Sequence, residues 1–126
     1  MRLPIIAASA VLLACTLAAC NKAQPMPTAP FTRPGVSMKL DPPDAPNCKP
    51  DTLYRATLNW SVDGIDAPKT EVRIGTPDGK VFARSNDRAA HAETSDWVRP
   101  GIWFLLFNRK NNDLLGALQA GPKPCP

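Results

Sequence analysis

The side chains that could do chemistry in this 126-residue chain are four cysteines, one histidine and eleven carboxylates. His91 is the only residue that could serve as the base of a histidine-dependent triad. Ser85 and Ser95 lie near it in the sequence, but neither stands in a nucleophile-elbow motif. A lone histidine among polar residues is most often solvated, and no second histidine is present to build a zinc site. We therefore expect no catalytic residue, no metal site and no cofactor.

Cys20 ends an apolar N-terminal run that carries a single charge, at Arg2. One positive residue, an apolar stretch and then small residues is the layout of a secretory signal peptide. The run is short for a membrane-spanning helix, which needs about 20 apolar residues. Its last four residues, Leu17-Ala18-Ala19-Cys20, resemble a bacterial lipobox. That resemblance implies that residues 1–19 are removed, that Cys20 is lipidated, and that the lipid bilayer is a partner.

Two other interpretations of this N-terminal run are open. Leu12-Leu13-Ala14-Cys15 also ends in cysteine, although its apolar stretch is shorter and its middle leucine fits a lipobox less well. An ordinary signal peptide cut near Ala19 would leave Cys20 as a thiol or a disulfide partner. In some lipoproteins an aspartate after the lipidated cysteine retains the protein in the inner membrane. Asn21 stands there instead, which favours the outer membrane, facing the periplasm.

The lipobox resemblance also assigns the other cysteines. Cys15 leaves with the signal peptide and Cys20 carries lipid, so Cys48 and Cys125 are a single pair in an oxidising compartment. A disulfide between them is predicted. In the chain-entropy model it would contribute about 4 to 5 kcal/mol, because it closes a long loop. Two free thiols are the alternative.

Residues 20–35 form a proline-rich segment that follows the proposed lipid anchor. Prolines at this density favour an extended path of about 3.1 Å per residue, which gives a reach of roughly 45 Å. We interpret the segment as a tether between the bilayer and a domain in residues 36–126. The alternative is disordered filler, and under both interpretations no core begins before Val36.

The charge pattern gives no support for a nucleic-acid partner. The mature chain keeps 14 basic residues (15 less Arg2) against 11 acidic ones. The two signs are interspersed, which is typical of a solvated surface. No basic patch indicates a nucleic-acid role.

Apolar residues alternate with polar ones through most of residues 36–126. The clearest strand has five apolar residues on one face: Tyr54, Ala56, Leu58, Trp60 and Val62. Further strands are predicted in 36–40, 70–75, 81–85, 101–109 and 114–121, with a weaker edge strand in 90–98. Segment 101–109 is apolar on both faces, so it is expected to be central. Pro77-Asp78-Gly79 predicts a tight hairpin turn with Gly79 at positive φ.

These seven short strands, without an amphipathic helix, predict an all-β, antiparallel β-sandwich. In an up-and-down order of seven strands, Cys48 and Cys125 would lie at the same pole. The segments VRIGTPDGKVFA and AETSDWVRPGIWFLLF resemble small immunoglobulin-like or fibronectin type III-like modules of bacterial envelope proteins. The resemblance spans about 40 residues and implies an immunoglobulin-like sandwich that binds, spaces or displays, without catalytic residues.

The sequence thus predicts a membrane-anchored periplasmic lipoprotein with a non-catalytic binding or structural module. Trp97, Trp103 and His91 are its candidates for contact with a protein or glycan partner, because exposed tryptophans stack on sugars and anchor proteins. One alternative is an inhibitor or immunity-type lipoprotein against a hydrolase, with residues 85–97 as a protruding loop. Another is an assembly component of an envelope secretion machine, and a hydrolase is the remotest.

Overall fold

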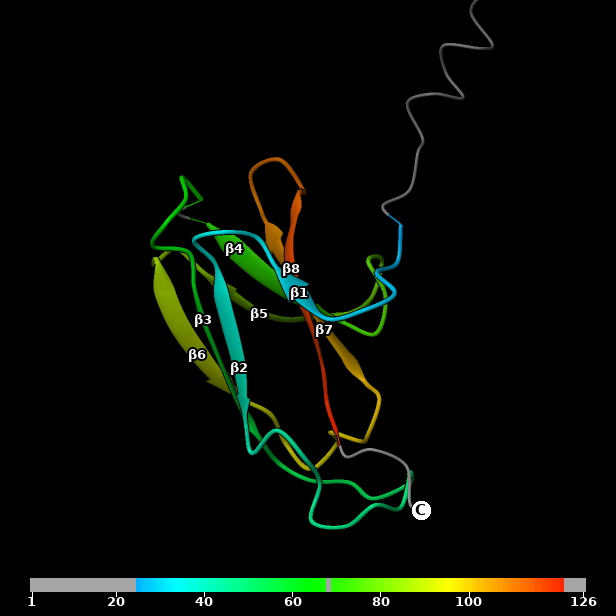
Figure 1. Cartoon of the computed structure of the whole chain (residues 1–126). Coiled ribbons are helices and arrows are strands. Elements are labelled where there is room, and N and C mark those ends of the chain that lie inside the picture. The colour runs from blue at the N-terminus through cyan, green and yellow to red at the C-terminus, as the bar shows by residue number, and fades with distance from the viewer. Residues whose placement is uncertain (1–24, 68, 122–126) are drawn as a thin grey trace, which may run out of the picture.

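The computed structural model describes residues 25–67 and 69–121, and these form eight β-strands in two antiparallel sheets. The two sheets form the two layers of a sandwich (Figure 1). The five-stranded sheet has the order β1-β8-β7-β4-β5, and the three-stranded sheet has the order β2-β3-β6. The strands are β1 (Phe31–Thr32), β2 (Ser37–Asp41), β3 (Thr57–Ser61), β4 (Thr70–Ile74), β5 (Val81–Ser85), β6 (Ala89–Glu93), β7 (Trp103–Asn108) and β8 (Leu114–Gln119).

The chain passes from one sheet to the other several times. After β2 and β3 pair, β4 and β5 form a hairpin in the opposite sheet, β6 returns beside β3, and β7 and β8 return beside β4. Such exchange between sheets is the Greek-key arrangement of immunoglobulin-like sandwiches. The predicted fold class is confirmed, and its seven strands correspond to β2–β8. The up-and-down strand order that supported the disulfide argument is wrong.

The main core lies between the two sheets and is built by the predicted alternation. All five apolar residues on one face of the segment around β3, from Tyr54 to Val62, are buried. They meet Val72 of β4 with Phe104 and Leu106 of β7. The other face of β7 is buried as well, because Leu105 and Phe107 form a second cluster with residues of β8. The prediction that this segment is central and covered on both faces is therefore confirmed.

β1 lies within the segment that the sequence indicated as a tether. Phe31 pairs with Ala117 and Thr32 with Gly116, so the chain joins the edge of the five-stranded sheet before the core begins. Both residues of β1 are exposed, and the core starts at Val36, as expected. Such a short pairing escapes sequence patterns because it has no buried face and is flanked by prolines, which edge strands tolerate.

The turn between β4 and β5 has the predicted position but not the predicted backbone conformation. Gly75, with φ of 88°, takes the left-handed conformation, and Gly79 does not. The Gly79 N–H donates to the Thr76 carbonyl at 2.8 Å. A Cβ atom on Gly79 would lie 2.0 Å from the carbonyl oxygen of Ile74. Glycine is thus required at position 79 by close packing of the backbone.

The segments that follow β2 and β8 meet at one pole. Asp44 forms a parallel bridge with Gly121. The Gly121 N–H donates to the Pro43 carbonyl at 2.9 Å, and the Ala45 N–H donates to the Gly121 carbonyl at 3.2 Å. Gly121 therefore lies at the same pole as residues 43–45, whereas the position expected for Cys125 falls outside the described residues.

Candidate binding surfaces

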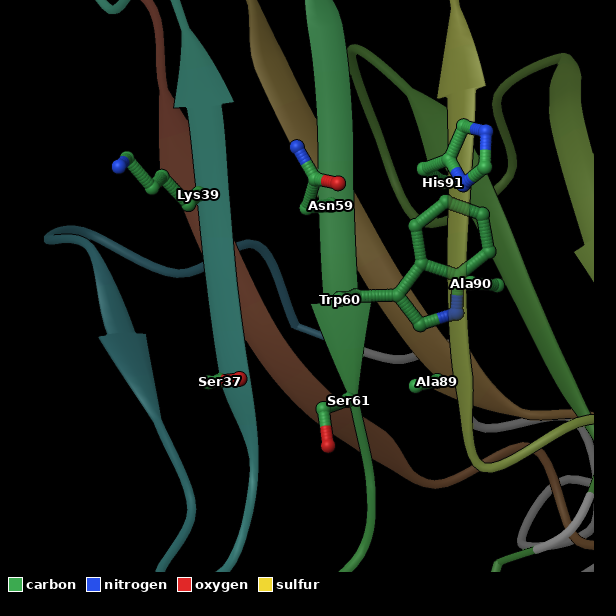
Figure 2. Close-up of a pocket in the computed structure, with 8 residues that line it drawn as sticks. All are labelled: Ser37, Lys39, Asn59, Trp60, Ser61, Ala89, Ala90 and His91. Atoms are coloured by element: carbon green, nitrogen blue, oxygen red, sulfur yellow. The ribbon is translucent and has the colours of Figure 1, made fainter.

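The outer face of the three-stranded sheet carries a row of polar side chains. Cross-strand register places Lys39 of β2, Asn59 of β3 and His91 of β6 side by side. The next row contains Ser37, Ser61 and Ala89, which are small. The step from long to short side chains leaves a hollow of about 450 Å³ (Figure 2). Its ammonium, amide, imidazole and hydroxyl groups are suited to hydrogen bonding with a polar ligand.

His91 lies on an edge strand of this sheet, and its side chain is exposed. None of the described side chains forms a hydrogen bond or an ion pair with it. The Ser85 hydroxyl instead accepts from the Asp87 N–H at 2.9 Å. Ser61, which is closer across the sheet, donates its hydroxyl to Asp63 at 3.0 Å. The described residues therefore assemble no hydrogen-bonded triad around His91.

A second, more apolar hollow lies where β5 meets the segment after β6. It has a volume of about 340 Å³ and is lined by Ile74, Lys80, Val81, Phe82 and Trp97. The rings of Phe82 and Trp97 meet edge to face with centroids 5.5 Å apart. Behind them, Phe104 lies 6.0 Å from Trp97 between centroids, which fixes the indole at the wall of the hollow.

A β-bulge puts Phe82 into this aromatic cluster. Ala83 pairs with Val72, but Val81 pairs with Arg73, so Phe82 is the extra residue of β5. An extra residue twists an edge strand and re-aims its side chains. Sequence alternation carries no signal for the bulge, so Phe82 could not be predicted as a neighbour of Trp97.

The three tryptophans lie in three different environments. Trp60 is buried between the sheets and donates its indole N–H to the Thr70 hydroxyl at 3.0 Å. Trp97 packs on the inner cluster, whereas Trp103 packs on the second cluster, on the outer face of the five-stranded sheet. Trp97 and Trp103 are each partly exposed but on different surfaces. They do not form the shared flat platform expected of a sugar-stacking site.

A charged network lies on the outer face of the five-stranded sheet. Glu71 is 4% exposed and accepts from Arg73 at 2.6 Å and from Arg84 at 2.9 Å. Arg73 also covers the Phe107 ring, with 4.0 Å from its guanidinium carbon to the ring centroid. Burial by itself raises the pKa of Glu71, but the hydrogen bonds and charges of both arginines outweigh it and lower that pKa overall. The carboxylate is thus a structural anion rather than a proton donor.

Cys48 lies half-buried in the long connection between β2 and β3, residues 42–56. Asn47 orders this loop, because its side-chain oxygen accepts from the Lys49 N–H and from the Thr52 hydroxyl. Leu53, which belongs to the same loop, is 56% exposed. Cys20 and Cys125 lie outside the described residues, so lipidation and the Cys48–Cys125 pairing stay predictions.

Two further observations concern the described segments 25–67 and 69–121. They contain no cluster of three or more histidine, cysteine, aspartate or glutamate side chains able to hold a metal ion. No helix in them is long and apolar enough to cross a membrane. Comparison with known proteins found no matching family model, no matching curated protein and no matching solved structure.

Proposed function

We propose that this protein is an envelope lipoprotein, anchored through acylated Cys20, whose sandwich is a non-catalytic binding module on the periplasmic side of the outer membrane. One observation carries the proposal: Leu17-Ala18-Ala19-Cys20 closes a signal-like run and is followed closely by a single small domain. Several acyl chains on one cysteine anchor a protein firmly, whereas one chain gives only marginal attachment.

Labelling of living cells with an alkyne analogue of palmitate tests the anchor. The wild-type chain should incorporate the label, and Cys20→Ser should lose it completely because the thioether has no sulfur to form on. Cys15→Ser is the matched control and should keep full labelling. If labelling is lost in Cys15→Ser and kept in Cys20→Ser, the lipid anchor is Cys15. If neither the wild-type chain nor a variant is labelled, the proposed lipid anchor is refuted.

A disulfide between Cys48 and Cys125 is part of the same proposal. Its support is the hydrogen-bonded contact of Gly121 with residues 43–45, which brings the end of the described chain beside the Cys48 loop. Cys125 is the fourth residue after Gly121. An extended chain of four residues reaches about 13 Å, enough to bring the two sulfurs together.

The apolar hollow at Trp97 is the surface that best supports partner binding. Aromatic side chains in a desolvated hollow are the commonest source of binding energy at protein interfaces. Val81, 37% exposed at its rim, offers an accessible point for a photo-cross-linking amino acid. In growing cells a cross-linker at Val81 should give a discrete adduct. The same group at exposed Lys110, in the β7–β8 loop, should give none, and equal patterns at both sites would contradict the assignment.

A hydrolase inhibitor is the second candidate function, and the exposed Leu53 favours it. Residues 85–97, expected to protrude, instead contribute the edge strand β6. The β2–β3 loop, residues 42–56, is longer than residues 85–97. It is held by the hydrogen bonds of Asn47 and exposes Leu53. If the protein is an inhibitor, it should slow a peptidoglycan hydrolase such as lysozyme, and Leu53→Asp should abolish the effect. Unchanged hydrolysis with the wild-type protein would refute this function.

A further inference from the structure

Two exposed apolar side chains lie in the part of the described chain that is nearest in sequence to its proposed anchor. Among the described residues, four large hydrophobic side chains are markedly exposed, and two of them, Met26 and Phe31, lie in or just before β1. In Figure 1 the blue start of the described chain leads directly into β1, at the edge of the five-stranded sheet.

The outer face of the five-stranded sheet continues this apolar surface. Phe31 pairs with Ala117, which in turn pairs with Leu105, so the three side chains share that face. Trp103 precedes Leu105 by two residues on β7 and therefore points to the same side. An exposed phenylalanine and a partly exposed indole thus flank a row of buried apolar residues.

The charges of the two sheets differ in a way that distinguishes their outer faces. Glu71 is the only acidic residue in the strands of the five-stranded sheet, and it is held by Arg73 and Arg84. That sheet therefore carries a net positive charge. The three-stranded sheet carries Lys39 against Asp41 and Glu93, a net negative charge. An anionic lipid surface attracts the first sheet and repels the second.

The length of chain between the proposed anchor and the sheet limits how far the domain can move from the bilayer. The chain is first paired with the domain at Phe31, whereas residues 25–30 are exposed apart from half-buried Pro27. Phe31 is eleven residues after Cys20, and a span of that length reaches at most about 40 Å when fully extended. The domain must therefore stay close to the bilayer, where even weak contacts form because the effective concentration is high.

We propose that the outer face of the five-stranded sheet rests on the phospholipid bilayer, with Phe31 and Trp103 in contact with the membrane interface. This inference depends on acylation of Cys20. Tryptophan prefers that depth, where its ring is partly apolar and its N–H meets polar headgroups. The orientation leaves the Lys39 row and the exposed Leu53 free for partners.

Tryptophan quenching in vesicles tests this orientation. The full chain, processed and acylated in a bacterial host, is reconstituted into vesicles of phosphatidylethanolamine and phosphatidylglycerol, with and without brominated acyl chains. Trp97→Phe keeps Trp103, Trp103→Phe keeps Trp97, and buried Trp60 contributes equally to both. Bromine should quench Trp97→Phe at least about twofold more than Trp103→Phe, because only the former retains an indole at the interface.

Adding Phe31→Ser to Trp97→Phe should reduce the quenching. Phe31 is exposed, so its replacement leaves the buried core intact, and circular dichroism verifies the fold. Protein that floats with the vesicles but shows equal quenching in both tryptophan variants overturns the orientation and leaves the anchor intact. Protein that fails to float overturns the acylation of Cys20 and, with it, this inference.

Discussion

At the scale of single residues, Glu71 is the clearest case of a polar group whose environment keeps it ionised. Its carboxylate is almost completely buried and accepts from two arginines. Removing one partner of a buried charged pair leaves the other without compensation, which usually costs more than the pair contributes. The network therefore holds β4 to β5 on the face that we place on the membrane.

Glu71→Gln should lower the free energy of unfolding by about 2 kcal/mol at pH 7, because two arginines lose their anion. The lowered pKa of Glu71 adds stability above its ordinary value of 4.5, and this contribution is lost as the pH falls through the folded-state pKa. The difference between the two proteins should therefore shrink at pH 3. Urea unfolding at both pH values measures it, and exposed Glu93→Gln is the control. A difference that stays constant with pH would contradict the assignment.

At the scale of elements, the two sheets are joined by a polar contact inside an apolar core. Trp60 of β3 donates to Thr70 of β4, and both side chains are buried. A buried donor that loses its acceptor is still removed from water, and this uncompensated desolvation lowers the stability of the fold. This hydrogen bond therefore fixes how the three-stranded sheet is placed on the five-stranded one.

Thr70→Val keeps the shape of the side chain but removes the acceptor, and it should cost about 1 to 3 kcal/mol of stability. Chemical denaturation provides the measurement. Thr57→Val, on the outer side of β3, should change stability by no more than about 0.5 kcal/mol. Equal effects of the two substitutions would show that the indole finds another acceptor.

The β4–β5 turn gives a second prediction at this scale. Gly79→Ala should cost at least about 2 kcal/mol, because the added Cβ would overlap the Ile74 carbonyl. Gly75→Ala should cost only about 1 kcal/mol, the price of a left-handed backbone in open space. Thermal unfolding of both variants ranks them. The reverse ranking would restore the conformation first predicted for Gly79.

At the scale of the whole molecule, the sequence predicted the strands better than their arrangement. Alternation located β2–β8 because each of these strands turns apolar residues toward a core, although those of β5 and β6 are only partly buried. It missed β1, which pairs through its backbone alone, and the bulge at Phe82, which depends on packing against Trp97 and Phe104. The order of strands in the two sheets depends on long-range pairing, which a local pattern does not contain.

For the candidate surfaces, too, the sequence predicted single residues better than their arrangement. Trp97, Trp103 and His91 were identified as exposed candidates, and each is at least partly accessible. The sequence did not show that they lie on three different surfaces, because this depends on which sheet each strand joins. Lys39 and Asn59 were missed as neighbours of His91 because cross-strand register brings them together.

The measurement that tests the central claim most directly is the intact mass of the protein extracted from membranes, before and after reduction. The account predicts a chain that begins at Cys20 and carries three acyl groups, with a mass that rises by two hydrogens when the Cys48–Cys125 bond is reduced. A soluble chain without lipid would contradict the anchor, and with it the membrane orientation of the five-stranded sheet.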